Sequence, residues 1–469
     1  SSNAPPQGPI YVAPTGGHVA PYGSWGNAAT NLNDAIAGTL MGDVVLITNG
    51  TYWLGREAII RTNLDVRSIN GPDTVIIIGP GTSRCFTVIG AGARLDGVTV
   101  SNGSDTNGGG VYVGPDATLK WSIVTGNTAT ESGGGVYSAS NGLVTRSEVM
   151  GNTARDGGGI YAVQGSRIQQ SFVHDNAALV AGGGIFASNA VQLLNTVVNS
   201  NSAYYGGGVY AASAVRFESC EIAGNRAEYG GGVYSRGSNV MWNCTIAHNE
   251  AGLSGGGIDD VDTEGYNCIV WQNTVTNGSA SANIFFGGAP NFFYTCTTPL
   301  IPGEGNTASD PLFLNAAAGD YHLNAVSPCV DTGTNNAWMI SVEDLSNHDR
   351  IRNLQVDMGA YEHYLWYQSD NLGGNWNGLS WFGYFNDGTD SWGRWVWHGE
   401  HGWLYYAGDS TSSILVWMPR FGGWLWTSDS IYPFVWSYSL NTWLWYYVGT
   451  GTPTGGWFYN SLTALNEWH

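Results

Sequence analysis

One cluster of acidic residues stands out in this chain, near residue 260. Asp259, Asp260, Asp262 and Glu264 fall within six consecutive positions. Carboxylates held together in this way can bind calcium, and two opposed carboxyl groups can act as acid and base in glycoside cleavage. Such sites also need a basic residue or opposed acids on neighbouring elements, and the rows beside this cluster are neutral. The cluster is therefore a weak candidate for metal binding, and we expect a loop that marks the end of a regular repeat.

The other reactive residue types do not assemble into a recognisable site. Lys120 is the single lysine, and Asp116 is its acidic neighbour within the same repeat, so a lyase base is not evident. The sequence shows no Ser-His-Asp order, phosphate loop or metal-binding His pair. Its six cysteines include no C-x-x-C pair, which argues against a zinc site. We therefore predict no catalytic residues, no cofactor and no enzymatic activity.

Composition and charge narrow the range of partners. The 469 residues include 36 acids and 16 bases, giving a net charge of −20. A surface this acidic repels phosphate backbones and anionic membranes, so we expect no nucleic-acid partner and no membrane insertion. No apolar run approaches the roughly 18 residues of a membrane-spanning helix. Ser1 is typical of a start left after processing, which fits a secreted or cell-surface protein.

A repeat of 24 or 25 residues organises the middle of the chain. A GGG triplet followed by an aliphatic residue begins at Gly108, Gly133, Gly157, Gly182, Gly206, Gly230 and Gly255. A second column holds Asn102, Asn127, Asn152, Asn176, Asn201, Asn225, Asn249 and Asn273. From Asn127 onward, a Val or Ile stands three residues before each Asn and a small residue stands five before it. Alternation with period two, in short runs broken by Gly and Asn, predicts strands.

A unit this short cannot bury its apolar face alone and must stack on copies of itself. The sequence therefore predicts an all-β chain, a right-handed parallel β-helix with 24–25 residues per coil and coils about 4.8 Å apart. A small aromatic-rich antiparallel β domain should follow it. The expected segments are an extended N-terminal segment (1–9), opening coils (10–101) with a capping helix near 27–40, seven regular repeats (102–273), final coils (274–362) and a Trp/Tyr-rich meander (363–469).

The Asn and Gly columns are interpreted as structural. Asn tolerates the left-handed backbone of a coil corner, and stacked amides can hydrogen-bond along the axis as a ladder. The Gly triplets permit a second tight corner, where a Cβ would clash. Cys220, Cys244 and Cys268 share one inward column, either as buried free thiols or with an axial disulfide between neighbours.

Two groups of aromatic residues are candidate interaction surfaces. One is an outward column that either forms a stabilising ladder, partly covered by the loops before each GGG, or offers a docking surface. The other lies in the last 107 residues, which hold 15 of the 21 tryptophans in alternating runs typical of hairpins. The candidates are Tyr112, Tyr137, Tyr161, Phe186, Tyr210 and Tyr234 in the column, and Trp424, Trp426, Trp443 and Trp445 in the tail.

Three stretches carry a resemblance to known families. The units typified by Val124 to Asn127 with GGGVY at Gly133 resemble the repeats of polymorphic outer-membrane proteins of bacterial autotransporters, with Val or Ile replacing Phe. GDVVLITNGTY and LDGVTVSNG are similar to the opening region of pectate-lyase-like bacterial surface proteins. SDPLFLNAAAGDYHLNAVSPCVDTGTN and VDMGAYE resemble the choice-of-anchor Q domain, although Cys329 stands where that family has a small apolar residue. The last resemblance implies a secreted β-helix protein with a C-terminal attachment module, and it implies no reaction.

The expected function is that of an extracellular structural protein. We predict a homo-oligomer that joins head to tail, as a filament, sheath or matrix subunit, with the segment 1–9 pairing with the aromatic tail of the next copy. One alternative is a carbohydrate-binding adhesin that uses the tail, with glycans as partners. A second alternative is a β-helix polysaccharide lyase or hydrolase.

Overall fold

The computed structural model describes residues 8–260, 262–277, 282–288, 291–351, 355–363, 370–373, 376–386, 395–406, 413–450 and 456–469. The chain divides into two compact units, residues 1–311 with 332–334 and 358–361, and residues 312–331, 335–357 and 362–469. The segment expected to pair between copies, 1–9, lies mostly outside the described residues. The predicted fold class is confirmed, because the first unit is a parallel β-helix and the second contains an antiparallel aromatic-rich sheet.

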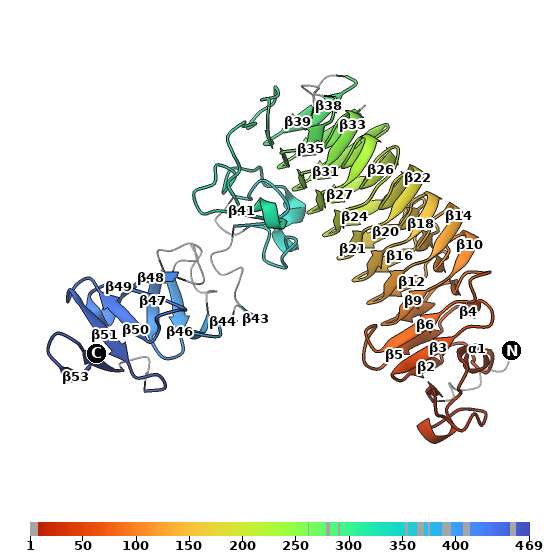
Figure 1. Cartoon of the computed structure of the whole chain (residues 1–469), viewed down its shortest axis with the longest axis horizontal. Helices are drawn as coiled ribbons and strands as arrows, with labels where there is room; N and C mark the ends of the chain where they lie inside the picture. Colours follow the sequence, from red (N-terminus) through yellow and green to blue (C-terminus); the bar gives the residue numbers. More distant parts are fainter. Residues whose placement is uncertain are drawn as a thin grey trace. The chain divides into compact units, whose positions relative to one another are not determined.

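Three long parallel sheets form the β-helix, and Figure 1 shows their coils following one another from the red end to the green end. Sheet A contains β1 (Ile10–Val12), β2 (Val44–Ile47), β5 (Asp65–Ser68), β8 (Arg94–Asp96), β12 (Thr118–Lys120), β16 (Leu143–Thr145), β20 (Arg167–Gln169), β24 (Gln192–Leu194), β27 (Arg216–Glu218), β31 (Ser238–Trp242), β35 (Asp262–Tyr266) and β39 (Asn291–Phe293). Sheet B contains β3 (Gly50–Trp53), β6 (Val75–Ile78), β9 (Thr99–Ser101), β13 (Ile123–Thr125), β17 (Glu148–Met150), β21 (Phe172–His174), β25 (Val197–Asn199), β28 (Glu221–Ala223), β32 (Thr245–Ala247), β36 (Ile269–Trp271) and β40 (Cys296–Thr297). Sheet C contains β4 (Ala58–Ile60), β7 (Phe86–Val88), β11 (Val111–Val113), β15 (Val136–Ser138), β19 (Ile160–Ala162), β23 (Ile185–Asn189), β26 (Val209–Ser213), β30 (Val233–Ser235), β34 (Ile258–Asp260) and β38 (Ile284–Phe286).

The segments before the GGG triplets also pair, although the sequence suggested loops there. They form a four-stranded sheet and a three-stranded sheet, again parallel, because each segment stacks on its equivalent in the next coil. Their strands are β10 (Ser104–Asn107), β14 (Thr128–Ser132), β18 (Thr153–Asp156), β22 (Ala177–Ala181), β29 (Arg226–Tyr229), β33 (Glu250–Ser254) and β37 (Thr274–Val275). Within the described residues, the last parallel strand of the β-helix is β40, so the expected final coils contribute such strands only as far as Thr297.

One or two side chains from each strand of the three long sheets point into the interior of the β-helix, where apolar residues form a continuous core. In sheet C the aliphatic residue after each GGG is buried, and the aromatic residue that follows it faces outward. At the N-terminal end the short helix α1 (Leu32–Ala37) packs Leu32 and Ala35 into this core. The Asn31 side chain caps α1 by accepting a hydrogen bond from the backbone N–H of Asn33 at 2.8 Å. A helix therefore lies within the predicted capping segment.

The asparagine ladder runs through the interior of one corner. Asn201 is typical: its Nδ2 donates to the carbonyl oxygen of Val173 and to Oδ1 of Asn225, and its Oδ1 accepts from the backbone and side-chain amides of Asn176. The same links run from Asn127 to Asn273, and Asn283 adds a member that the spacing did not suggest. These amides satisfy buried backbone groups in each coil, so they tie the coils together from within.

Two details of this ladder correct the sequence interpretation. Asn102 is not a member, because its side chain donates to Gly79 and the position equivalent to Asn127 is Gly103, whose N–H donates to Asn127. The left-handed backbone also lies one residue earlier than expected, at Gly126, Gly151 and their equivalents. The ladder Asn residues are therefore selected for hydrogen bonding and not for backbone conformation.

The Gly triplets fit tightly against this ladder. The first Gly of each triplet has a positive φ, between 60° and 68°, which L side chains rarely adopt. A Cβ on the third Gly would approach the ladder amide, for example to 2.8 Å from Nδ2 of Asn127 at Gly110. The Gly triplets and the Asn ladder therefore pack directly against each other inside the β-helix.

The second unit begins with an antiparallel pair, β41 (Phe313–Asn315) and β42 (Asp320–Leu323). Arg350 and Glu362 form a buried ion pair at 3.0 Å, and burial raises the pKa of the Glu362 carboxyl. The aromatic-rich sheet follows as a meander of β43 (Asp370–Gly373), β44 (Trp376–Leu379), β45 (Gly383–Asn386), β46 (Trp395–His398), β47 (Gly402–Tyr406), β48 (Ser413–Met418), β49 (Gly423–Ser428), β50 (Phe434–Ser437), β51 (Thr442–Tyr446), β52 (Trp457–Asn460) and β53 (Leu465–Trp468).

Candidate functional site

The meander sheet has a buried face, which carries aliphatic side chains together with rings such as Tyr446 and Phe458, and an outer face that carries further aromatic side chains. One face supplies the core of the unit, where Leu404, Val416, Leu425 and Leu444 are buried. Residues at alternate positions of the same strands point the other way. On β51 these are Trp443 and Trp445, which remain 38% and 39% exposed. The sheet therefore presents large rings to the solvent in a row that crosses several strands.

A groove of about 340 Å³ lies on this outer face. It is lined by Phe434, Trp443, Trp445, Tyr447, Tyr459 and Ser461. Strand pairing brings the rings together, since Trp445 lies opposite Phe434 on one side and Tyr459 on the other. This volume is within the range of small-molecule sites, which is roughly 300–1,000 Å³. We refer to this site as the tail groove.

The rings of the tail groove meet at steep angles. Phe434 and Trp445 lie 4.4 Å apart with an interplanar angle of 86°, and Trp436 and Trp443 lie 5.4 Å apart at 69°. Rings in this arrangement meet edge to face and do not stack, and Trp443 and Trp445 stay 38% and 39% exposed. Polar groups stand beside them, because Tyr447 donates to Asn466 and the Ser461 hydroxyl contacts that of Thr442 at 2.9 Å.

Beneath the groove, a buried polar cluster fixes the inner face of β51. The Tyr446 hydroxyl donates to Glu400 at 2.5 Å, and Arg420 contacts Nδ1 of His401 at 2.8 Å. Burial lowers the pKa of His398 to about 4 and lowers that of His401 well below its ordinary value. Both histidines are therefore neutral at pH 7, and they act as packing and hydrogen-bonding groups under the aromatic face.

Trp424 and Trp426 lie on the neighbouring strand β49, outside the groove lining. Both are half-buried, and the Trp426 indole donates to Ser413 at 3.1 Å. Trp426 also meets Trp443 edge to face, with ring centres 6.1 Å apart. Of the four tail tryptophans named from the sequence, Trp443 and Trp445 line the groove and Trp426 supports it from the side.

The outward column of the β-helix has a different geometry. From Tyr112 to Tyr210 the rings stack face to face, with centres 4.5 to 5.4 Å apart and interplanar angles of 5° to 9°. Arg84 lies over the ring of Tyr112, and Arg236 lies over that of Tyr234. Each ring face is covered by the next ring, so this column, which we call the ring stack, exposes edges.

The acidic residues near 260 do not converge. Asp259 takes the place of the column tyrosine and accepts from Ser254, whereas Asp260 points inward and is 4% exposed. Asp262 instead accepts from Ser238 on the previous coil at 2.6 Å. Among the described residues, no group of three or more His, Cys, Asp and Glu side chains is arranged to hold a metal. Asp259 and Asp260 are successive residues of β34 and point to opposite faces, whereas Asp262 and Glu264 lie on β35, so the four carboxylates of the weak candidate Asp259, Asp260, Asp262 and Glu264 are not gathered in one place.

The structure also brings together charged residues that the sequence analysis did not pair. Lys120 lies directly opposite Asp96 of the previous coil, on the outer face of sheet A. Arg67 lies opposite Asp96 on the other side, and Asp65 on the same strand as Arg67 accepts from Arg94 at 3.1 and 2.6 Å, so these residues form one charged row on sheet A. Burial raises the pKa of Asp96, although Lys120 and Arg94 oppose this effect. The sequence prediction looked for acidic neighbours of Lys120 only within its own repeat. Aligning the sequence coil by coil places Asp96 opposite Lys120.

All six cysteines are buried free thiols. The column Cys220, Cys244 and Cys268 packs into the core, and burial raises the pKa of the Cys244 thiol well above its ordinary value. The sequence left open either free thiols or an axial disulfide in this column, and the structure has free thiols.

Comparison with known proteins finds similarity in solved structures alone. No protein-family model and no curated protein matches this chain. Pectate lyase Pel9A is similar with a TM-score of 0.52 and 18% sequence identity, over 77% of this chain and 97% of the lyase. A pectin methylesterase in complex with a hexasaccharide gives a TM-score of 0.30 at 12% identity, covering 64% of this chain and 91% of that one. The catalytic domain of a GH87 alpha-1,3-glucanase gives 0.29 at 9% identity, covering 62% of this chain and 70% of that one.

These neighbours show the fold, a parallel β-helix that resembles pectate lyase. They also correct one expectation. The similar structure that shows the fold, pectate lyase Pel9A, is an enzyme, and this finding contradicts the prediction that the chain has no enzymatic activity. The prediction considered acidic neighbours of Lys120 only within its own repeat, whereas the β-helix places Asp96 of the previous coil beside it. Within the described residues, no helix has the length and apolar character needed to cross a membrane.

Proposed function

We propose that the protein is a polysaccharide-active β-helix protein that holds a glycan chain in the tail groove. The observation that carries this proposal is the set of solvent-exposed aromatic side chains that lines that groove. A sugar ring presents C–H groups on its faces and hydroxyl groups at its rim. Flat aromatic surfaces with polar groups at their edges match both features, because Tyr and Trp combine an apolar body with a polar handle.

The lining of the tail groove also indicates the class of glycan. All six side chains are uncharged, and the chain as a whole carries a net charge of −20. Among the described residues, no cation lines the groove to balance a carboxylate or sulfate, and the surrounding field disfavours an anion. A neutral polysaccharide therefore fits this groove better than an acidic one.

The charged row on sheet A is where a chemical step would take place. Asp96 has a carboxyl with a raised pKa beside the Lys120 ammonium and Arg94. A carboxyl tuned in this direction can exchange a proton closer to neutral pH than an ordinary Asp. Because the groove and the row belong to separate units of one chain, binding by one unit raises the local concentration of polymer for the other.

Binding to insoluble neutral glycans tests the proposal directly. We expect the intact protein to be depleted from solution by at least one of cellulose, chitin and an insoluble α-glucan. Trp445→Ala should weaken this binding at least 10-fold, because a central aromatic anchor carries about 1.4 kcal/mol or more. Trp403→Ala is the matched control, since Trp403 is 41% exposed on the same sheet and does not line the groove.

The proposal fails if none of these glycans binds, or if Trp403→Ala and Trp445→Ala weaken binding equally. Activity has its own readout, the appearance of new reducing ends or unsaturated sugars. Asp96→Asn should lower that rate about 100-fold or more, as expected for loss of a general acid or base. Binding by the tail groove should be unchanged in this variant.

A second candidate is self-association through the end of the meander. In the described part of the sheet, β53 is the edge strand, and it carries the exposed Leu465 and Trp468. An edge with apolar side chains can pair with another copy. Light scattering on the intact protein and on Leu465→Lys tests this: the candidate requires an oligomer that the charged variant dissociates.

A further inference from the structure

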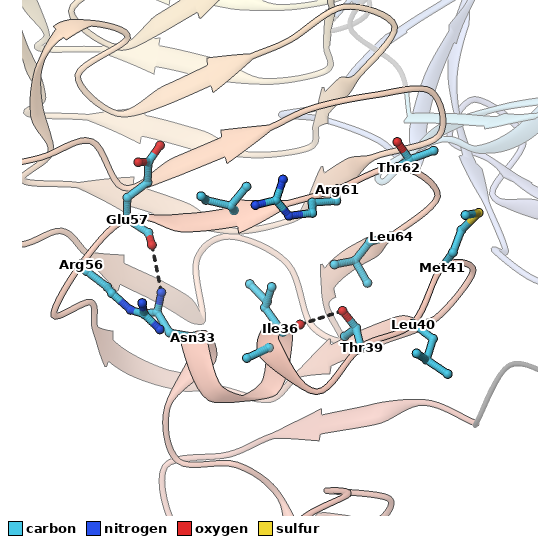
Figure 2. A pocket seen from close by; sticks show the side chains of 12 residues that line it. Asn33, Ile36, Thr39, Leu40, Met41, Arg56, Glu57, Arg61, Thr62 and Leu64 are labelled. Atoms are coloured by element: carbon cyan, nitrogen blue, oxygen red, sulfur yellow. Dashed lines mark hydrogen bonds between the residues drawn. The ribbon is translucent and has the colours of Figure 1, made fainter. Parts of the chain in front are cut away.

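The opening of the β-helix holds a second groove, far in sequence from the tail. It measures about 600 Å³ and lies between α1 and the coil that contains β4. Figure 2 shows Arg56 at one end of this groove, Thr62 and Met41 at the other, and Arg61 between them. Ile36, Ile59 and Leu64 supply aliphatic surface in between. We refer to it as the cap groove.

The positive charge of the cap groove is not neutralised by its neighbours. In the part of the chain that the structure describes, the guanidinium groups of Arg56 and Arg61 have no hydrogen bond or ion pair. Glu57 lines the same groove, but its carboxylate accepts from Thr87 and lies 3.4 Å from Nε of Arg84. Asp34, on α1, lies 3.5 Å from His18 instead. Two unpaired cations therefore face one groove in a protein with a net charge of −20.

The walls of the cap groove are fixed by local bonds. The Asn33 side chain donates to the backbone oxygen of Glu57 at 3.0 Å, which ties α1 to the coil, and Figure 2 shows this bond. The hydroxyl of Thr39 donates to Ile36 at 2.7 Å, and Asp43 accepts from the backbone N–H of Leu40 at 2.6 Å. A groove preformed in this way loses little conformational entropy when it binds a ligand.

We propose that the cap groove is a second binding site, for an anionic saccharide. Guanidinium groups recognise carboxylate and sulfate oxygens with paired hydrogen bonds. The aliphatic surface suits the C–H face of a sugar ring, and the groove is open to solvent along its length, which would leave a hydrocarbon chain wet. The site goes beyond the function proposed above, because it lies in the other unit and selects the opposite class of glycan.

The test uses the intact protein and three oligosaccharides of equal length, one uronate, one sulfated and one neutral. Calorimetry or fluorescence anisotropy should show binding of at least one anionic probe and much weaker binding of the neutral one at this site. The double variant Arg56→Ala/Arg61→Ala should weaken anionic binding at least 10-fold. Raising the salt concentration from 50 to 300 mM should also weaken it several-fold, because salt screens solvent-exposed charge pairs.

Matched variants separate this site from general charge and from the tail groove. Arg167→Ala removes an exposed, unpaired arginine elsewhere on the β-helix and should leave binding unchanged. Arg61→Lys should recover part of the affinity, and Trp445→Ala should have no effect on the anionic probes. The inference is overturned if neither anionic probe binds, if the double variant binds the anionic probes as tightly as the wild type, or if Arg167→Ala weakens their binding as much as the double variant does. A carboxylate or sulfate preference in the wild type identifies which anion the site takes.

Discussion

The protein carries two rows of aromatic side chains on the outer faces of β-sheets, and it arranges their rings in opposite ways. In the ring stack, parallel strands in exact register place identical rings above one another, so each face is covered by its neighbour. In the tail groove, antiparallel strands bring different residues together at steep angles, with Trp443 and Trp445 more than one-third exposed. Aromatic content alone therefore does not indicate a binding surface, because the pairing of the strands decides whether ring faces are available.

Acidification should separate the two regions most strongly. Burial lowers the pKa of His398 to about 4 and lowers that of His401 well below its ordinary value, whereas unfolded histidines bind protons near pH 6.5. Below pH 6.5 the unfolded tail therefore binds more protons than the folded tail. The folded tail loses stability progressively as the pH falls through this range. Between pH 6.5 and 5, His398 alone should lower the free energy of unfolding by about 1.5 kcal/mol, and His401 acts in the same direction.

In the β-helix the sign is reversed at Asp260, whose pKa is raised by burial. Its protonated form is favoured in the folded state, so falling pH stabilises this site until the unfolded Asp also protonates, near pH 4. Urea unfolding followed by tryptophan emission reports mainly the tail, which has 15 of the 21 tryptophans. A urea midpoint for this signal that stays constant from pH 7 to 5 would contradict the assignment of neutral buried histidines.

Graded substitution of Trp445 sharpens the difference between a ring face and general apolar burial. Trp445→Leu should weaken neutral-glycan binding 10-fold or more, whereas Trp445→Phe, which keeps a smaller flat surface, should weaken it about 3-fold. Binding isotherms for the two variants decide the matter. Equal losses would show that the groove recognises its ligand without using ring faces.

The ring stack should respond in stability and not in binding. Tyr161→Ala removes contacts with Tyr137 and Phe186, so it should destabilise the β-helix by about 1–2 kcal/mol. Glycan binding by the tail groove should not change. Circular dichroism in denaturant gives the first quantity and a depletion assay gives the second. A loss of glycan affinity in this variant would mean that the stack is a binding surface after all.

The smallest effect is expected at Phe186, the one Phe in the stack. Phe186→Tyr adds a hydroxyl at an outward edge, where the other five positions already have one. The free energy of unfolding should change by less than about 0.5 kcal/mol, as for surface substitutions away from special features. A thermal melt is sufficient, and a large loss would indicate that this ring edge is buried against an unrecognised surface.

The fold could be predicted because its signal is repeated in every coil. Period-two alternation places Val124 and its equivalents inward, and the structure has them fully buried. The position of the ladder residue within a coil was harder to predict. Asn102 precedes Asn127 by 25 residues and Gly103 precedes it by 24, and since both intervals occur elsewhere in the repeat, spacing alone could not exclude Asn102 from the ladder. Gly265, where the inward pattern fails, is filled by the ring of Phe292 from the next coil.

The sites were harder to predict, because their residues meet through pairing that the sequence does not state. Lys120 and Asp96 are 24 positions apart, and the acid belongs to a coil whose repeat signature is weak. The tail groove draws on β50, β51 and β52, whose irregular spacing hides which rings are neighbours. In both cases the residue types were visible in the sequence, and the partners became evident with the strand register.

The asparagine ladder has a consequence for how such a molecule can change over generations. Each amide accepts from the coil before it and donates to the coil after it, so every internal coil presents the same bonding pattern on both sides. Removing or duplicating one whole coil would bring together coils whose hydrogen-bonding patterns match. The two ends of the β-helix would stay unchanged. Unequal recombination between repeats can therefore alter the distance along the axis from the cap groove to the last coil in uniform steps, without redesigning any corner.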